Sequence, residues 1–185
     1  MQKRGKLIVL SGPSGCGKNT VYEELVKKDP NIVQTVSATT RAPREGERDG
    51  VEYYFMTEEA FREKEARGEF LETVLYGKNH YGTLKSEVDR LLAEERIVIL
   101  IIEVNGAGNI KRSRPDAVSV FLMPPSLEAL RRRLVKRGQD SAEDIERRLS
   151  IAAAEMEARV MYDYCVVNDD LAVCVQDVYN IILNN

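Results

Sequence analysis

The chain has 185 residues, of which 43% are hydrophobic and 31% are charged, a balance that is ordinary for a globular protein. This length suits one compact domain with small insertions better than two independent domains. The net charge of −3 gives the surface no general attraction for nucleic acid or an anionic membrane, so any anion site must be built locally.

The start of the chain predicts a strand, a helix and a second strand. Residues 6–10 form a short apolar run before a Gly-rich turn, which is typical of a buried strand. A helix is predicted over residues 18–28, ending before Asp29-Pro30, and residues 31–38 predict the next strand.

The composition changes between residues 39 and 82. Charged turns, such as residues 44–50, alternate with strand-like runs at residues 51–56 and 69–76. A helix is predicted over residues 57–67, between these two runs. The pattern indicates a small α+β insert and not a further βαβ unit.

Helices and strands alternate again after the insert. Helices at residues 85–95 and 107–112 precede strands at residues 97–102 and 118–123. An Arg-rich helix follows over residues 126–137, and Ser141 with Asp144 has the spacing of a capping box for a helix that reaches residue 161. A strand at residues 164–167 and a helix at residues 170–183 complete an α/β fold, in which helices cover both faces of a central parallel sheet.

The sharpest motif follows the first predicted strand and opens the first predicted helix. Gly12, four residues and then Gly17-Lys18 have the spacing of a phosphate-binding P-loop, whose lysine reaches the β- and γ-phosphates of a nucleoside triphosphate. Glycines let backbone N–H groups approach phosphate closely, and the helix N-terminus adds partial positive charge. The predicted triphosphate-binding residues are Gly12, Pro13, Ser14, Gly15, Cys16, Gly17, Lys18, Asn19 and Thr20.

The residue after the P-loop lysine departs from the motif. The motif has a Ser or Thr there, whose hydroxyl binds Mg²⁺, whereas this chain has Asn19 followed by Thr20. An amide oxygen can ligate a hard cation, or the phosphates and water can hold most of it. The sequence therefore leaves the protein ligand of the metal open.

Arginines and tyrosines of the insert indicate a second phosphate site. Arg41 and Arg44 are three residues apart beside hydroxyl side chains, and Tyr53 and Tyr81 follow. Guanidinium groups bind the oxygens of a phosphate monoester bidentately. Singly, these residues also fit a solvated turn or half-buried packing; their joint occurrence behind a P-loop favours a site.

From about residue 7 to residue 183, these motifs resemble the guanylate kinase family in order and spacing. The resemblance implies a P-loop nucleoside monophosphate kinase fold that transfers a phosphoryl group from ATP to GMP, with Mg²⁺ as cofactor. It implies one domain, residues 1–185, with a core of about residues 1–36, 84–125 and 160–185. A GMP-binding insert would take residues 37–83 and a mobile lid residues 126–159.

The resemblance also implies roles within the insert. Arg41, Arg44, Tyr53 and Tyr81 would hold the GMP phosphate, with Arg41 also counted as catalytic. The guanine would be read by Ser37, Glu72 and Thr83. A carboxylate such as Glu72 can accept from guanine N1–H and the 2-amino group together, and adenine offers neither donor.

The lid and the late strand carry the remaining implied residues. Arg133, Arg137 and Arg148 have the spacing of the family's lid arginines, which close over the triphosphate. Such cations stabilise the charge that phosphoryl transfer spreads over the moving group. Asn168 would lie near the adenine side, and His80 is expected to be an exposed turn residue and not a catalyst.

The run from Leu100 to Gly106 is a second departure from the family. The family usually has acids at the positions of Ile101 and Glu103 and Gln at that of Asn105, so only Glu103 remains to assist GMP and the water shell of the metal. Two interpretations of Ile101 stay open. Either a function is weakened, or Ile101 simply extends the buried run of residues 97–102 and a neighbouring residue covers the lost role.

Two other functions fit parts of the pattern. A non-catalytic guanylate-kinase-like module would use the cleft to bind peptide, and a related P-loop kinase would act on another phosphorylated acceptor, such as a sugar. The complete Gly17-Lys18 pair and the lid arginines count against the first, and the guanine-reading residues against the second.

The sequence also predicts the compartment. The apolar run at residues 7–10 is too short for a secretory signal, and no stretch reaches the ~20 apolar residues of a membrane span. The cysteines, Cys16, Cys165 and Cys174, have no ligand spacing. A cytoplasmic protein with ATP and GMP as partners, and with neither nucleic acid nor membrane, is expected; the oligomeric state is not indicated.

Overall fold

A computed structural model of the protein describes residues 5–138 and 141–185, apart from the side chains of Asn105 and Arg137. Five strands of this part form a parallel sheet in the order β2-β7-β1-β8-β9. Their bounds are Lys6–Ser11 for β1, Ile32–Gln34 for β2, Ile97–Ile101 for β7, Val118–Met123 for β8 and Tyr164–Val167 for β9. The predicted α/β fold with a central parallel sheet is confirmed.

Helices cover both faces of this sheet because its central strands are apolar on both faces. Ile8 and Leu10 of β1 pack in one cluster with residues of α1 and α7, whereas Leu7 and Val9 pack in another with residues of α3 and α4. The two-residue period of a strand thus divides the core into two layers. The helices are α1 (Lys18–Lys28), α3 (Lys85–Ala93), α4 (Val104–Ser113) and α7 (Leu171–Asn184).

The insert contains a second, four-stranded sheet in the order β4-β3-β6-β5. Its elements are β3 (Ala38–Thr39), β4 (Tyr54–Phe55), α2 (Glu58–Ala66), β5 (Phe70–Tyr76) and β6 (Asn79–Leu84). Phe61 of α2 is fully buried and stacks on Phe70, with the ring centroids 4.5 Å apart. The insert therefore has an apolar cluster of its own.

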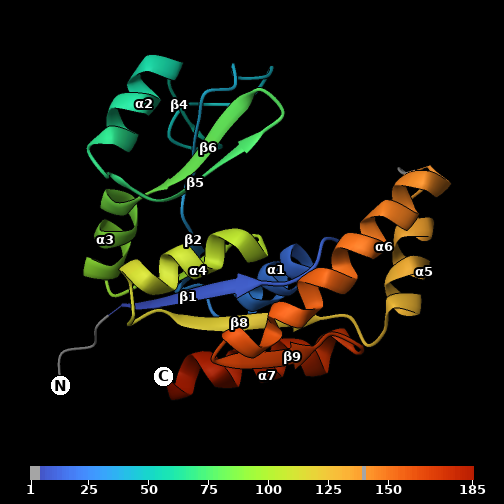
Figure 1. The fold of residues 1–185 in the computed structure, drawn as a ribbon. Coiled ribbons are helices and arrows are strands. Elements are labelled where there is room, and N and C mark those ends of the chain that lie inside the picture. The colour runs from blue at the N-terminus through green and yellow to red at the C-terminus, as the bar shows by residue number, and fades with distance from the viewer. Residues whose placement is uncertain (1–4, 139–140) are drawn as a thin grey trace.

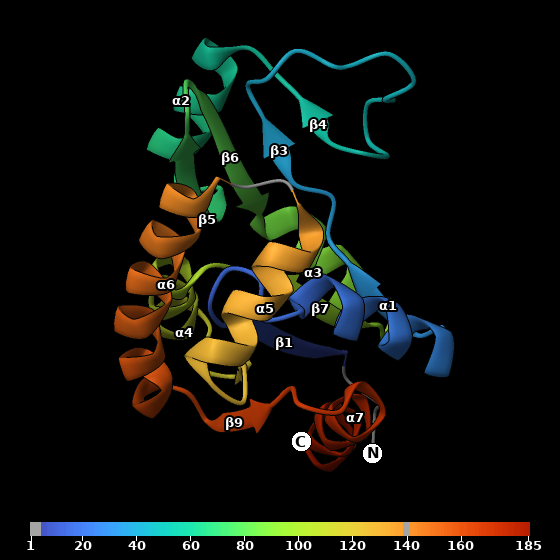
Figure 2. The same cartoon turned by 90° about the vertical axis from the view of Figure 1, so that its right-hand side faces the viewer.

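The two helices after β8 form a second projecting unit. They are α5 (Leu127–Arg137) and α6 (Ala142–Glu157), and a 3₁₀ turn, η1 (Ala158–Met161), leads from α6 to β9. Leu130 and Leu134 of α5 pack against Ile145 and Leu149 of α6, and the Ser141 hydroxyl caps α6 as predicted. In Figures 1 and 2 this helix pair and the insert rise from the parallel sheet as separate arms.

The structure differs from the predicted elements in several places. The strand predicted at residues 31–38 is two strands in different sheets, because the chain leaves the parallel sheet after Gln34 and enters the insert at Ala38. Strand β6 was not predicted, and the helix predicted to reach residue 161 ends at Glu157. Among the described residues, no helix combines the length and the apolar character that a bilayer crossing requires.

Candidate active site

The P-loop joins the end of β1 to the start of α1. Gly12, Gly15 and Gly17 have positive φ angles of 139°, 85° and 102°. A Cβ atom on Gly12 would overlap the Leu122 carbonyl oxygen, and one on Gly17 would lie 2.5 Å from Asn168 Nδ2. Only glycine fits these two positions, so the backbone of β8 and the end of β9 fix the shape of the loop.

Lys18 is held over the loop that it follows. Its Nζ donates to the Gly12 carbonyl at 2.6 Å and to the Pro13 carbonyl at 3.1 Å. The loop lines a cavity of about 340 Å³, which is also bounded by Asn19, Thr20, Ile101, Glu103 and Glu155. Backbone dipoles, one ammonium group and two carboxylates therefore surround one space.

Residues behind the P-loop hold its backbone. Asn168 Nδ2 donates to the Cys16 carbonyl at 2.9 Å, and Asn168 is 6% exposed. Arg133 of α5 donates through Nη2 to the Asn168 carbonyl at 2.6 Å and through Nη1 to the Cys16 carbonyl at 3.4 Å. The Cys16 thiol is fully buried, and burial raises its pKa. Asn168 and Arg133 thus contact the loop directly, and Cys16 is a packing residue.

The other two arginines predicted for the lid are Arg148 and Arg137. Arg148 is half-buried on α6, and the Arg137 side chain lies outside the described residues. Arg131 of α5 pairs with Glu146 of α6, with Nη2 and Oε2 3.0 Å apart. This exposed ion pair joins α5 to α6.

Arg41 and the predicted tyrosines gather on one side of the insert. The Arg41 guanidinium carbon lies 5.3 Å from the Tyr53 ring centroid, and the rings of Tyr53 and Tyr81 meet edge to face at 5.9 Å. Arg41 Nη2 also donates to Glu47 Oε1 at 2.8 Å, and the Arg44 backbone N–H donates to Glu47 Oε2 at 2.7 Å. The Arg44 side chain itself is exposed.

The sequence interpretation missed Glu47. Hydrogen bonding to Arg41 and to the Arg44 backbone N–H lowers the pKa of Glu47, so the carboxylate is ionised where it meets Arg41. Its position three residues after Arg44 was the available signal. However, a spacing of three residues in a charged turn does not distinguish a carboxylate that orients an arginine from one that is simply solvated.

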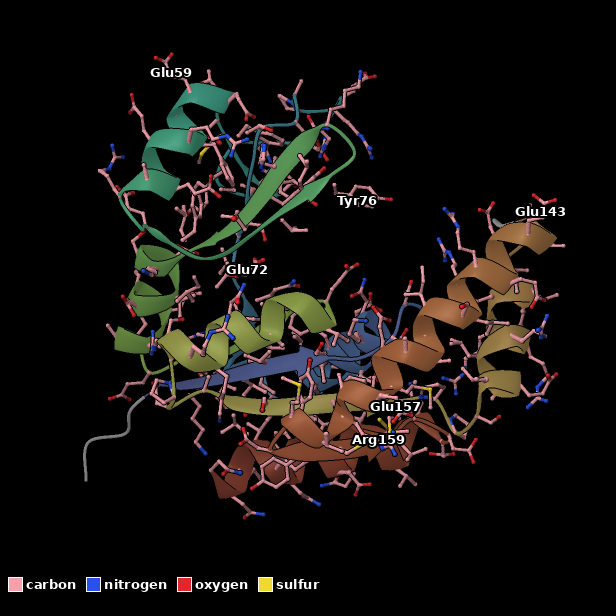
Figure 3. All side chains as sticks on the ribbon, viewed as in Figure 1. Glu59, Glu72, Tyr76, Glu143, Glu157 and Arg159 are labelled. Carbon is pink, nitrogen blue, oxygen red and sulfur yellow. The ribbon has the colours of Figure 1, made fainter. Side chains whose placement is uncertain are left out.

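Glu72 and Thr83 face each other across the β5–β6 hairpin. The Thr83 hydroxyl donates to Glu72 Oε1 at 2.9 Å, and Thr83 is 4% exposed. Glu72 Oε2 points toward α4, since a Cβ atom on Gly106 would lie 3.6 Å from it. Burial raises the pKa of Glu72, and the Thr83 hydroxyl opposes that shift. In Figure 3, Glu72 lies at the edge of the insert that faces α4.

The remaining predicted positions are Ser37, Glu103 and Ile101. Ser37 precedes β3 and is half-buried; its carbonyl accepts from the Tyr54 N–H at 2.9 Å. Ile101 ends β7, packs partly against the core, and also lines the P-loop cavity. Glu103 precedes α4 and lines the same cavity, in which Glu155 of α6 is a carboxylate that the sequence interpretation missed.

The expectation for His80 was wrong. His80 lies in β6, its side chain is 12% exposed, and its ring lies 5.3 Å from the Phe61 ring. Its Nε2 lies 3.2 Å from Glu58 Oε1 and 2.9 Å from Arg62 Nη2. It packs α2 onto the sheet of the insert and is not an exposed turn residue.

Comparisons with known proteins agree on one family. The sequence model of the guanylate kinase family matches residues 4–185. A guanylate kinase of Trichormus variabilis is 46% identical over 172 residues, which are 93% of this chain and 86% of that protein. One of Hydrogenovibrio crunogenus is 44% identical over 98% of this chain and 88% of its own length. The crystal structure of guanylate kinase from Anaplasma phagocytophilum matches with a TM-score of 0.73 and 34% identity, over 100% of this chain and 87% of that one.

Proposed function

Since the chain belongs to the guanylate kinase family and transfers a phosphoryl group from ATP to GMP, we propose that its P-loop holds ATP and its insert holds GMP. The observation that carries the acceptor assignment is the pair formed by half-buried Glu72 and buried Thr83, which presents carboxylate Oε2 toward α4. Guanine N1–H and its 2-amino group are two adjacent donors that suit one carboxylate. Ser37, at the start of the same sheet, completes the proposed guanine site.

The GMP phosphate is proposed to bind at the Arg41 cluster. Arg41 is already oriented by Glu47 and by the rings of Tyr53 and Phe55. A phosphate monoester carries more charge than Glu47, and the tyrosine hydroxyls and Arg44 add donors for it. The bound phosphate is itself an anionic nucleophile, so the reaction requires no general base.

The donor side stabilises the group that moves. The P-loop backbone N–H groups and the α1 N-terminus bind the ATP phosphates. When ATP binds, Lys18 exchanges its two carbonyl partners for phosphate oxygens. Its positive charge then stabilises the negative charge on the phosphoryl group as that group is transferred. Arg133, Arg137 and Arg148 on the lid helices are proposed to add positive charge around the same group.

The residues around the P-loop cavity fit a magnesium ion that arrives with ATP. They offer the oxygen donors that a hard cation prefers: the Asn19 amide, the Thr20 hydroxyl and the carboxylates of Glu103 and Glu155. Among the described residues, no group of three or more His, Cys, Asp or Glu side chains can hold a metal without a nucleotide. Bound magnesium would neutralise charge on the phosphates of ATP.

An ADP-release assay against a panel of nucleoside monophosphates tests this assignment. GMP is expected to be the preferred acceptor, with AMP slower by about 10⁴-fold, because AMP leaves the Glu72 carboxylate unpaired. A preference for AMP or UMP would contradict the guanine site. ADP release with a phosphorylated sugar, and not with GMP, would point to the other acceptor class.

A further inference from the structure

Glu155 has a carboxylate oxygen that the fold leaves without a partner. Its Oε2 is buried and makes no hydrogen bond to any described residue. Burial raises the pKa of Glu155, and the charge of Glu103 adds to that shift, whereas the Lys18 charge and the nearby Ser14 backbone N–H oppose it. Glu155 lies near the end of α6, so this lid helix places an acid inside the P-loop cavity.

The position of Glu155 matters because one wall of the cavity is apolar. Ile101 ends β7 beside the P-loop, and its side chain provides no oxygen atom to the cavity. Glu103, two residues later, lies on the α4 side, and Glu155 enters from α6. Two carboxylates from separate elements therefore remain around the space next to Lys18.

Charge limits what can bind between these groups. A triphosphate brings several negative charges toward Glu103 and Glu155, and Lys18 offsets only one. A divalent cation on the phosphates reverses the sign of the interaction, since its water molecules donate to carboxylates. The cavity is thus suited to a triphosphate–cation complex and unfavourable to the bare triphosphate.

We propose that Glu155 is a positioning residue for the ATP-bound cation and, with Glu103, accepts from the cation's water shell in place of the acid that Ile101 replaces. The proposal rests on the function proposed above. It identifies α6 as the element that supplies the missing carboxylate. Closing of the lid over ATP and recognition of the cation then involve the same helix.

The test measures binding of a non-hydrolysable ATP analogue, with an imido bridge between the β- and γ-phosphates, by calorimetry in Mg²⁺ and in EDTA. Glu155→Gln is expected to weaken binding in Mg²⁺ by about tenfold, because one hydrogen bond to a charged group is lost. In EDTA the same variant is expected to bind a few-fold more tightly, because a like charge is removed. Glu157→Gln is the matched control: Glu157 lies on the same helix, and its side chain is 80% exposed beside Arg159 (Figure 3).

Two further variants separate this role from a structural one. Glu155→Asp keeps the negative charge and is expected to retain most of the difference in analogue affinity between Mg²⁺ and EDTA. This variant keeps the test valid if a thermal melt shows that Glu155→Gln is destabilised. Adding Ile101→Asp to Glu155→Gln is expected to restore part of the lost Mg²⁺-dependent affinity.

The possible outcomes address the two proposals separately. Equal weakening of Glu155→Gln in Mg²⁺ and in EDTA, or an unchanged ratio of the two affinities, would overturn the role of Glu155. Wild-type protein that binds the analogue no better in Mg²⁺ than in EDTA would instead overturn the proposed magnesium–ATP site.

Discussion

Glu72 combines two requirements that oppose each other, ionisation and burial. In the proposed guanine site, both oxygens of its carboxylate accept hydrogen bonds only when the group is ionised, yet burial raises its pKa above the ordinary value of 4.5. For an acid with a raised folded-state pKa, the ionised form costs stability at neutral pH. That cost disappears as the pH falls through the folded pKa. The GMP-free protein therefore retains the proton on Glu72 more readily than the unfolded chain does.

The pH dependence of GMP binding follows from this. As the pH falls from about 7 to about 5, KM for GMP is expected to rise, since a protonated Glu72 loses an acceptor for guanine. The rise should begin at a higher pH than for an exposed glutamate. Glu72→Gln should flatten this profile and narrow the preference for GMP over AMP. A wild-type KM that stays constant over this range would contradict the role of Glu72.

Lys18 is the residue whose removal should separate catalysis from folding. Its ammonium group donates hydrogen bonds to two loop carbonyls, and its side chain packs in no core cluster among the described residues, so Lys18→Ala should leave the thermal melt nearly unchanged. Turnover in the ADP-release assay should fall by about 10²–10³-fold, the typical effect of losing one group that stabilises transition-state charge. Lys27→Ala is the control, because Lys27 is exposed and pairs only with Glu24 among the described residues. Near-normal turnover of Lys18→Ala would refute the P-loop assignment.

At the scale of elements, one carboxylate links the two arginines of the loop between β3 and β4. Glu47 joins the Arg41 side chain to the Arg44 backbone, and so fixes both arginines relative to β3. Glu47→Gln should raise KM for GMP by about three- to tenfold and leave KM for ATP unchanged, because a neutral amide binds guanidinium more weakly. Steady-state kinetics with each substrate varied in turn measures this. Glu45→Gln, in the exposed part of the same loop, is the control; an equal effect there would indicate a general loss of negative charge.

Elements with a local signal were predictable from the sequence, and elements defined by distant contacts were not. Strand β8 and helix α1 have the predicted bounds because apolar runs and Asp29-Pro30 mark them. Strand β6 was missed because its residues, Asn79–Leu84, are mostly polar and are held by pairing with β5. The division between β2 and β3 depends on which sheet each joins, and no local pattern encodes that choice.

The residues of the candidate site also divide into those with a local sequence signal and those brought in by distant contacts. The P-loop is contiguous in the chain, so its glycines and Lys18 were evident from spacing alone. Glu155 reaches the same cavity from α6, more than a hundred residues later, and a glutamate on an amphipathic helix carries no local mark. The contact of Asn168 with the Cys16 carbonyl also depends on the pairing of β9 with β8.

At the scale of the whole molecule, the residues proposed to bind the nucleotides come from three packed units. The P-loop belongs to the parallel sheet, Glu72 to the insert with its cluster around Phe61, and Arg133 to the helix pair around Leu130. Each unit has its own apolar cluster, and so each can keep its shape while its position changes. Binding of both nucleotides therefore acts on the arrangement of the units more than on their interiors.

The strand order also has a consequence for the order in which the parts of the protein can fold during and after synthesis. Strand β1, which carries the P-loop, pairs with β7 and β8, and both are synthesised after the whole insert. The strands of the insert sheet are closer to one another in sequence than β1 is to β7 or β8, so their pairing costs less loop-closure entropy. We therefore expect the P-loop, although it is synthesised early, to become ordered after the insert sheet. In pulsed hydrogen exchange during refolding, amides of β5 and β6 should gain protection before those of β1; the reverse order would mean that the parallel sheet nucleates folding.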